Sequence, residues 1–250
     1  MNMNRQEKKY IRSLHQAKTR IPTGRCLVEG VRAVGTFLDS RHILDKLYLT
    51  EKSYRQHQDF CERIKHAHGG YTVISDDAML DISAASTPSG VLAIFCLAPT
   101  QAPLACGIVC AQLQDPGNVG TVIRSAVAFN KKTVVLVDSV DPWSPKVIQA
   151  SAGTIAKSDL HILSWQMLQE KKGAVPLAAL VTQGGSSPSS DDAEALLVIG
   201  NEANGLPPGW VRSCEKKITL VMPGQTESLN AGVAGSIALY MTISNKQVVI

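Results

Sequence analysis

The sequence lacks several features that would assign it to a common class of protein. It contains no run of 18 apolar residues, so no membrane-spanning helix is expected. No apolar segment follows the charges of residues 1–20, so this segment is not expected to be a secretory signal. Aromatic residues make up only 5% of the chain, which argues against a sheet that stacks nucleic-acid bases on aromatic side chains.

Motifs for common cofactors and metals are also missing. Neither G-x-G-x-x-G nor G-x-x-x-x-G-K-[ST] occurs, so neither a Rossmann dinucleotide site nor a P-loop is expected. The six cysteines form no C-x-x-C pair, and no histidine or further cysteine stands at ligand spacing. We therefore expect reduced cysteines, a cytoplasmic protein and no metal site.

The net charge of +4 is distributed unevenly along the chain. Residues 1–32 contain eight Lys and Arg against two acids, so this segment carries +6 and the rest of the chain −2. A basic arm at 1–20, expected to be helical, favours contact with phosphates. The alternative is a solvated tail, and charge alone does not decide between the two.

Strand and helix patterns alternate through the first half of the 250 residues, a length that fits one large or two modest domains. Strands are predicted at 26–30, 46–50, 71–75 and 90–97, with helices starting at 31 and covering 51–68 and 76–83. Residues 98–105, which include two prolines, are the best candidate for a linker.

The second half alternates more strictly. Strands are predicted at 108–113, 133–138, 159–164, 176–182, 196–200 and 217–222, with helices at 121–130, 145–153 and 165–171. These strands are apolar without alternation, which indicates burial on both faces. The pattern predicts a parallel sheet covered by helices.

Three polar segments follow predicted strands, where α/β proteins commonly bind small molecules. The first, DPGNVGTVIRSAVAFN at 115–130, places Asn118 in a loop and Arg124 one turn into a helix, where both could face one ligand. The alternative is a helix N-cap and a surface arginine. The second, VIGNEANGLPPGW at 198–210, carries Glu202 in a loop after a strand, with a tight turn as the alternative.

The third segment is VMPGQTESLNAGVAGSIALYM, residues 221–241. Pro223 and Gly224 break the strand, and Ser228 is the expected N-cap of a small-residue helix. Glu227, Ser228 and Asn230 gather at the start of that helix. A loop with this composition exposes backbone N–H and C=O groups to a ligand.

In their order and spacing these segments resemble the SpoU-type (TrmH-like) RNA ribose 2′-O-methyltransferases of the SPOUT superfamily. They match the motifs N-x-G-x-x-x-R, strand-G-N-E-G-x-G-L and P-M-x-G-x-x-x-S-L-N of that family. In the first half, RCLVEGVRAV at 25–34 and STPSGVLAIF at 86–95 are similar to the small ribosomal-protein-like substrate-binding domain that often precedes the catalytic domain. The resemblance covers nearly the whole chain.

The resemblance implies an α/β fold class: a C-terminal trefoil-knotted SPOUT domain with a mostly parallel sheet, preceded by a small αβ substrate-binding domain. The boundaries that we expect are a basic arm at 1–20, an RNA substrate-binding domain at 21–97, a linker at 98–105 and a methyltransferase domain at 106–250. The resemblance also implies a homodimer, paired through the C-terminal domain, in which two subunits complete the site.

The implied cofactor is S-adenosylmethionine, bound in a bent form by the knot loops. Its expected binding residues are Gly200, Leu220, Met222, Leu229 and Asn230. The expected reaction centre consists of Asn118, Arg124, Glu202, Ser228 and Asn230. Ala203 stands where the family usually has glycine, and it would be strained if that position needs a positive φ. Ala231-Gly232 replaces the more usual Val-Ser, a small-for-small change.

Arg124 is the residue whose role we weigh most closely. A free guanidinium is essentially always protonated, so stabilisation of the developing alkoxide and anchoring of a phosphate are its preferred roles. Whether it also takes the proton of the 2′-hydroxyl is open. No metal is needed, because the methyl carbon of a sulfonium is already a strong electrophile.

The implied function is methylation of a ribose 2′-hydroxyl in structured RNA, with ribosomal RNA favoured by the two-domain layout. A tRNA ribose methyltransferase and a non-catalytic RNA-binding or assembly protein are the alternatives. The basic residues of the first 32 positions would contact RNA phosphates. These are Arg5, Lys8, Lys9, Arg12, Lys18, Arg20, Arg25 and Arg32.

Overall fold

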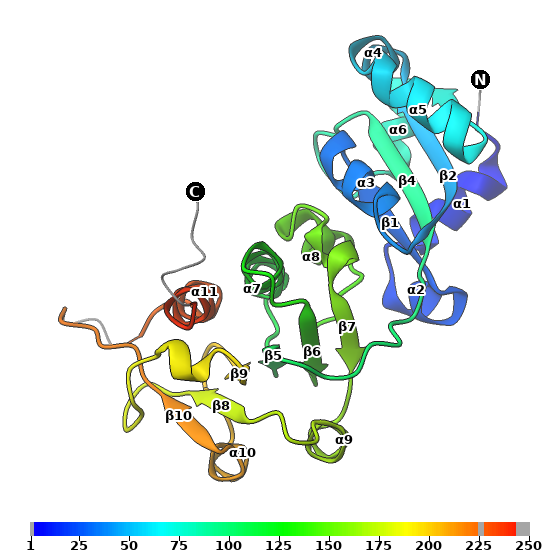
Figure 1. Cartoon of the computed structure of the whole chain (residues 1–250). Helices are drawn as coiled ribbons and strands as arrows, with labels where there is room; N and C mark the ends of the chain where they lie inside the picture. The colour runs from blue at the N-terminus through cyan, green and yellow to red at the C-terminus, as the bar shows by residue number, and fades with distance from the viewer. Residues whose placement is uncertain (1–2, 225–227, 244–250) are drawn as a thin grey trace. The chain divides into compact units, whose positions relative to one another are not determined.

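The computed structural model describes residues 3–224 and 228–243. The chain divides into two compact units (Figure 1). The first comprises the residues up to Ala98 together with Trp143–Lys157, and the second comprises Pro99–Pro142 and the residues from Ser158 onward. The domain boundaries expected from the sequence stay predictions. Within the described ranges, no helix is long and apolar enough to cross a membrane.

A four-stranded mixed sheet organises the first unit, in the order β1-β4-β2-β3. Strand β4 runs antiparallel to β1 and β2, whereas β3 is parallel to β2. The strands are β1 (Arg25–Glu29), β2 (Ile43–Thr50), β3 (Thr72–Ile74) and β4 (Val91–Cys96). The helices are α1 (Arg5–Ser13), α2 (Ala17–Thr23), α3 (Val31–Leu38), α4 (Glu51–Gln56), α5 (Gln58–His68) and α6 (Asp76–Ile82).

The polar helix predicted at 51–68 is two helices. His57 separates α4 from α5 with a non-helical backbone of φ −127° and ψ 47°. The four predicted strands of this half are all present, with ends shifted by up to three residues.

Helix α1 belongs to the core of the first unit. Ile11 and Leu14 are fully buried in the same cluster as Met79 of α6. On the rim, the carboxylate of Asp81 accepts hydrogen bonds from Lys8 (2.9 Å) and Arg12 (2.7 Å). The basic N-terminal helix is therefore anchored by apolar burial as well as by charge.

The segment between two strands of the second unit also packs on the first unit. It contains α8 (Pro145–Ala150) and a 3-10 turn, η1 (Thr154–Lys157), so the helix predicted at 145–153 ends at Ala150. The Trp143 ring lies 6.5 Å from Phe37 and 5.2 Å from His42. A Cβ atom at Gly153 would come within 2.8 Å of the Ala33 Cα, so η1 and α3 can approach only because position 153 is glycine.

The second unit contains a six-stranded sheet in the order β10-β8-β9-β5-β6-β7. Every pairing in it is parallel, as predicted. The strands are β5 (Gly107–Ala111), β6 (Thr133–Val137), β7 (Asp159–Ile162), β8 (Leu177–Leu180), β9 (Leu196–Ile199) and β10 (Lys216–Ile218). The helices are α7 (Pro116–Ala128), α9 (Trp165–Lys171), α10 (Pro208–Arg212) and α11 (Ala231–Met241), with a 3-10 turn, η2 (Ser190–Asp192).

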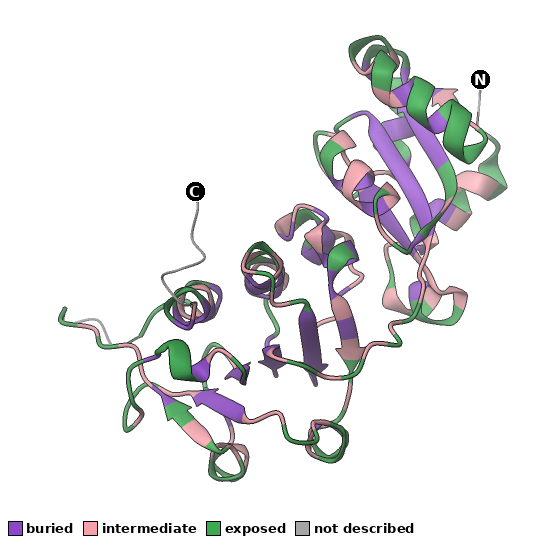
Figure 2. Ribbon diagram, in the orientation of Figure 1, coloured by how far each residue is buried: buried purple, intermediate pink, exposed green. Residues whose placement is uncertain are grey.

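Burial follows the expectation for a parallel sheet. The central strands β5, β6 and β9 are buried along their whole length (Figure 2). Helices α7 and α11 pack against each other, and α11 also contacts β9. Because all strands run the same way, their carboxyl ends lie along one edge, which is where the three polar segments emerge.

Two helix starts differ from the sequence prediction. Helix α7 begins at Pro116, with the side chain of Asp115 accepting from the N–H of Asn118, so Asn118 lies in the first turn of the helix. Helix α11 is capped by Asn230, whose side chain accepts from the N–H of Val233 at 3.2 Å, and the expected cap at Ser228 is wrong. In α7 the side chain of Asp115, and in α11 the side chain of Asn230, accepts from a free N–H group of the first helical turn.

His42 is a buried neutral base at the end of the first unit. It is 5% exposed, and its Nδ1 accepts from the N–H of Ala98 at 3.0 Å. Its Nε2 is buried and has no hydrogen-bond partner among residues 3–224 and 228–243. Burial, with a smaller contribution from the charge of Arg41, lowers the pKa of His42 to about 4.

This low pKa predicts a pH-dependent stability. An unfolded histidine has a pKa of about 6.5, so between about pH 6.5 and pH 4 the unfolded chain takes up the proton first. The contribution of His42 to the free energy of unfolding is complete above about pH 6.5 and is lost as the pH falls towards 4, by up to about 3 kcal/mol. Urea denaturation at pH 7 and pH 5 measures it. His42→Gln should lose this part of the pH dependence, whereas the exposed control His66→Gln should retain it; equal pH dependence in His42→Gln and wild type would contradict the prediction.

Candidate active site

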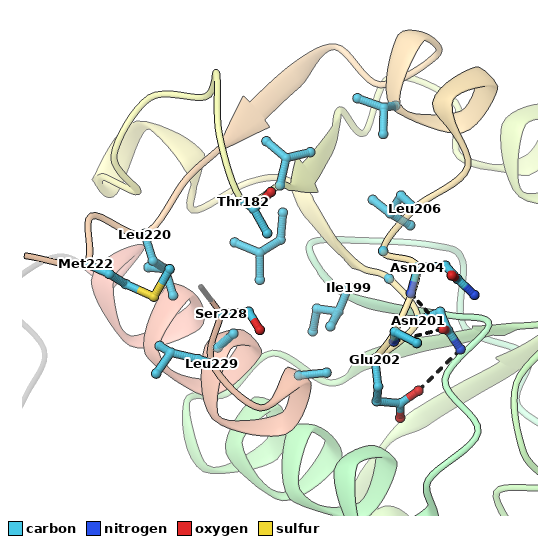
Figure 3. A pocket seen from close by; sticks show the side chains of 18 residues that line it. Thr182, Ile199, Asn201, Glu202, Asn204, Leu206, Leu220, Met222, Ser228 and Leu229 are labelled. Atoms are coloured by element: carbon cyan, nitrogen blue, oxygen red, sulfur yellow. Dashed lines mark hydrogen bonds between the residues drawn. The ribbon is translucent and has the colours of Figure 1, made fainter. Parts of the chain in front are cut away.

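A pocket of about 470 Å³ opens at the carboxyl ends of β8 and β9. Leu220, Met222, Ser228 and Leu229 lie on one side of it, and the loop after β9 lies on the other (Figure 3). The lining comes from the end of β8 and the residues after it, the end of β9 and its loop, the last turn of α10, Leu220 and Met222, and the segment that leads into α11 with its first turn. Its members are Leu180, Val181, Thr182, Ile199, Gly200, Asn201, Glu202, Ala203, Asn204, Gly205, Leu206, Val211, Leu220, Met222, Ser228, Leu229, Ala231 and Ala234.

The loop after β9 is a tight turn held by its own backbone. Asn201 and Gly205 exchange N–H···O bonds of 3.1 and 2.9 Å, and the Asn201 side chain accepts from the N–H groups of Ala203 and Asn204. Gly205 has a φ of +64°, but Ala203 is not among the residues with positive φ. Alanine at 203 is therefore unstrained.

Gly200 sits where no side chain fits. A Cβ atom there would come within 2.6 Å of the backbone of Gly205 and Leu206. Glycine at 200 is what lets the turn fold back against the end of β9 and form one wall of the pocket.

The carboxylate of Glu202 joins the β9 loop to the loop before α7. It accepts from the Asn118 side chain at 3.0 Å, from the N–H groups of Asp115 (3.2 Å) and Gln114 (3.4 Å), and from Asn201 Nδ2 at 3.4 Å. Burial by itself would raise the pKa of Glu202, but the hydrogen bonds outweigh it and the pKa is lowered. Glu202 is thus ionised at neutral pH, and its hydrogen bonds clamp the β9 loop to the loop before α7.

Of the residues predicted for the cofactor, four line this pocket and one does not. Gly200, Leu220, Met222 and Leu229 are in the lining, whereas Asn230 caps α11 beside it. Besides apolar side chains, the lining offers amides and hydroxyls, which suits a ligand with both apolar and polar parts. These polar groups belong to Asn201, Asn204, Thr182 and Ser228.

The predicted reaction centre is only partly assembled within one chain. Glu202 and Ser228 line the pocket, and Asn118 bonds to Glu202. Arg124 lies on the exposed side of α7, and its side chain has neither a hydrogen bond nor an ion pair among the described residues. Six positions on a helix separate two residues by about 120°, which is why Arg124 and Asn118 do not face one ligand. Glu227 lies outside the described residues.

The start of α11 lies directly against Asn118. A Cβ atom at Gly232 would be 3.2 Å from the Asn118 Cα, so the departure from the family pattern at 231–232 leaves the two segments in close contact. One turn later, a Cβ atom at Gly235 would lie 2.5 Å from the Ile199 Cδ1.

Two amide side chains of the site, those of Asn201 and Gln114, were missed by sequence reasoning. Asn201 donates to the carbonyl of Gln112 at 2.9 Å, and Gln114 donates to the carbonyl of Asp138 at 2.9 Å. The only available signal was their position shortly after buried strands, which does not separate a structural amide from a catalytic one.

The predicted RNA-binding residues fall into two groups in the structure. Lys8 and Arg12 pair with Asp81, Arg25 pairs with Asp45 at 3.0 Å, and Arg20 is 4% exposed with its guanidinium donating to the Leu14 carbonyl. The other group has no ion pair with another described residue. It consists of Arg5, Lys9, Lys18 and Arg32.

Both the fold and the site define a parallel α/β enzyme with a ligand pocket at the carboxyl ends of its strands. The chain superposes with a TM-score of 0.81 on a putative RNA methyltransferase of the TrmH family from Porphyromonas gingivalis, at 27% identity over 97% of this chain and 98% of the other. It also superposes with a TM-score of 0.82 on an AdoMet-bound rRNA methyltransferase from Sinorhizobium meliloti, at 24% identity over 97% and 95% of the two chains. This second likeness shows the fold.

Sequence comparison gives the family. Residues 105–240, more than half of the chain, match the SpoU rRNA Methylase family, and residues 6–93 match the MRM3-like substrate binding domain. The chain therefore belongs to the SpoU rRNA methylase family. A 23S rRNA (guanosine(2553)-2′-O)-methyltransferase of Bacillus subtilis is 28% identical over 92% of both chains. The expected class, an RNA methyltransferase, is confirmed.

The crowding at Gly200 predicts a sharp loss of cofactor affinity in Gly200→Ala. The added methyl group meets backbone atoms, and overpacking of this kind costs about 1–3 kcal/mol. We expect the S-adenosylmethionine dissociation constant from calorimetry to rise at least about fivefold. The matched control is Gly209→Ala on α10, where the nearest atom is the end of a flexible arginine side chain at 4.0 Å. Unchanged affinity in Gly200→Ala would show that the pocket does not hold the cofactor.

Proposed function

We propose that this protein transfers the methyl group of S-adenosylmethionine to a ribose 2′-hydroxyl of ribosomal RNA. The observation that carries the proposal is the pocket, whose lining contains four of the five residues expected to bind the cofactor, next to the Asn118–Glu202 pair. The relative from Bacillus subtilis, matched over 92% of both chains, is named for 2′-O-methylation of 23S rRNA.

The pocket residues suit this cofactor chemically. When bound, S-adenosylmethionine supplies a methyl carbon that a ribose 2′-oxygen can attack, with sulfur as the leaving group and loss of the hydroxyl proton. Leu220, Met222 and Leu229 offer apolar contacts, while Asn201 and Ser228 offer hydrogen bonds. The absence of a side chain at Gly200 lets the turn after β9 fold back and form one wall of the pocket.

Asn118, Glu202 and Arg124 take different parts in the reaction. Asn118 is held by ionised Glu202 and keeps the start of α7 fixed next to α11. Arg124 remains charged and exposed, free to anchor an RNA phosphate and to stabilise the developing alkoxide. Alignment of the 2′-oxygen with the methyl group supplies much of the acceleration.

The function is tested by mapping ribose methylation in total RNA from cells with and without the gene. We expect one or more 2′-O-methyl marks in ribosomal RNA to disappear on deletion and to be restored by the wild-type gene. Loss of 2′-O-methyl marks from tRNA instead would identify tRNA as the substrate. No change together with no calorimetric binding of S-adenosylmethionine would indicate a non-catalytic protein.

Arg124→Ala should lower the rate of methyl transfer by roughly 10², the usual effect of removing one donor to a developing oxyanion. The measurement is incorporation of labelled methyl groups into unmethylated ribosomal RNA. Arg212→Ala, the other arginine of the second unit, is the control and should retain activity. Full activity in Arg124→Ala would exclude both roles given to Arg124.

We also propose that the basic residues of the first unit without an acidic partner bind RNA phosphates. Lys9 and Lys18 have no such partner among the described residues, so their charges are available to a phosphate backbone. Removal of 1–20 would delete buried Ile11 and Leu14, so substitutions test this surface better than truncation.

The double variant Lys9→Ala/Lys18→Ala should bind ribosomal RNA more weakly. Its plot of log affinity against log salt should be shallower by about one unit for each phosphate that the variant no longer neutralises. Filter binding at several salt concentrations measures the slope. Lys171→Ala on α9 serves as the control. A double variant with the wild-type slope would show that these two lysines do not contact RNA phosphates.

For assembly, we propose a homodimer formed through α11. Val233, Ile237, Tyr240 and Met241 are 39–52% exposed on one face of this helix, whereas Gly235, Ala238 and Leu239 on the opposite face are buried. Between these faces, Ser236 bonds to Ser125 of α7 at 2.7 Å. A second copy would cover this apolar face. Pairing would complete a reaction centre that is only partly assembled in one chain, where Arg124 is exposed and outside the pocket.

Ile237→Glu should shift the protein towards monomer in analytical ultracentrifugation and lower the rate of methyl transfer. A buried unpaired charge opposes association strongly. Ile162→Glu is the matched control, because Ile162 is 64% exposed on β7 and lies outside the proposed face. A dimer that persists in Ile237→Glu would rule out this face.

Two further properties implied by the family are also proposals. We propose a cytoplasmic location, supported by six cysteines that are all free thiols, and cell fractionation tests it. We propose that the chain around the pocket is threaded as a trefoil knot, and an experimental tracing of residues 220–230 tests that.

A further inference from the structure

Two neighbouring strands of the second unit end in the same unusual backbone conformation. Gln112 follows β5 with a φ of +60°, and Asp138 follows β6 with a φ of +50°. Non-glycine residues with such angles are uncommon and need surrounding contacts to hold them. Both turns lie at the carboxyl edge of the sheet, where the pocket is.

The two turns are tied to each other by hydrogen bonds. Gln114 donates from its side chain to the Asp138 carbonyl at 2.9 Å, while its own N–H is bound by Glu202 at 3.4 Å. The loop after β6 therefore shares a network with the Asn118–Glu202 pair. Three more hydrogen bonds join the two turns. The Ser139 hydroxyl donates to the Cys110 carbonyl at 2.8 Å and accepts from the N–H of Leu113 at 3.0 Å. The N–H of Val140 donates to the Leu113 carbonyl at 2.9 Å.

Shortly after this tie the chain enters the first unit. Trp143 packs there with Phe37 and His42, and the residues that follow remain with that unit up to Lys157. Residues 138–143 thus have one end fixed at the reaction centre and the other fixed in the substrate-binding unit. Six residues span at most about 20 Å when fully extended.

The chain passes from one unit to the other at three places. The passage at Pro142–Trp143 differs from the other two in the end of the strand that it adjoins. The chain also passes between the units at Ala98–Pro99 and at Lys157–Ser158. Those two crossings lead to the amino ends of β5 and β7, on the side of the parallel sheet away from the pocket. Only the crossing at Pro142–Trp143 leaves from a carboxyl end.

We propose that Gln114 and Trp143 are positioning residues that hold the two ends of segment 138–143 and couple the substrate-binding unit to the reaction centre. Neither side chain need touch the cofactor or the reacting atoms. Gln114 fixes the end next to Asn118 and Glu202, and Trp143 fixes the end in the unit that holds RNA. The proposal rests on the proposed function, because its effect appears in methyl transfer to RNA.

The test is a double-mutant cycle on Gln114→Ala and Trp143→Ala, with ribosomal RNA from a strain lacking the gene as substrate. Each single variant should lower kcat about tenfold, since small misplacements of a reacting group are costly. The S-adenosylmethionine dissociation constant from calorimetry should stay within about twofold, because neither residue lines the pocket. The double variant should be no slower than the slower single variant, which is the signature of residues that act through one element.

Controls separate coupling from damage to the fold. Gln166→Ala removes an exposed glutamine that bonds to Glu170 at 3.0 Å on α9, and it should leave kcat unchanged. Trp143→Phe keeps an aromatic ring against Phe37 and should recover most of the activity. Urea denaturation checks that Trp143→Ala is folded; if it is not, Trp143→Phe replaces it in the cycle with a smaller expected loss.

The possible results are distinct. Independent effects, with about a hundredfold loss in the double variant, would overturn the coupling, and so would wild-type kcat in Gln114→Ala. Wild-type protein that transfers no methyl group to any RNA would instead overturn the proposed function. Weaker cofactor binding in both single variants would overturn the coupling too, because the residues would then support the pocket rather than the link between the units.

Discussion

The candidate site depends on the hydrogen bonds that the carboxylate of Glu202 accepts. Four donors from two segments, residues 114–118 and the β9 loop, converge on it, and one of them is the side chain of Asn118 at 3.0 Å. Glu202 is exposed, but its oxygens accept from all four of these donors, so the clamp fixes the loops that supply them. The same network reaches the end of β6 through Gln114, which connects pocket geometry to the chain that enters the first unit.

Three glycines near Glu202 allow the segments of the site to pack closely. Gly200, Gly232 and Gly235 each lie where a Cβ atom would meet a neighbour at 2.5–3.2 Å. These positions let the β9 loop fold back on itself and let α11 lie close against α7 and β9. Such contacts are sensitive to a single methyl group because protein interiors are densely packed.

Much of the architecture could be predicted because it follows from local pattern. The apolar strands of the second half indicated the parallel sheet, and all ten predicted strands are present. Helix ends were less predictable: His57 breaks a helix whose polarity looked continuous, and Asn230 rather than Ser228 caps α11. Capping depends on which side chain reaches the free N–H groups, and several candidates within three residues look alike in sequence.

Local sequence was enough to indicate the family, the cofactor and the residues that gather at one edge of the sheet, because motif spacing and strand polarity are properties of short segments. How those residues are used depends on the folded chain. Folding placed Asn118 against Glu202, left Arg124 exposed, paired Lys8 and Arg12 with Asp81, and joined residues 143–157 to the first unit. These outcomes rest on contacts between segments far apart in the chain, for which a local pattern carries no signal.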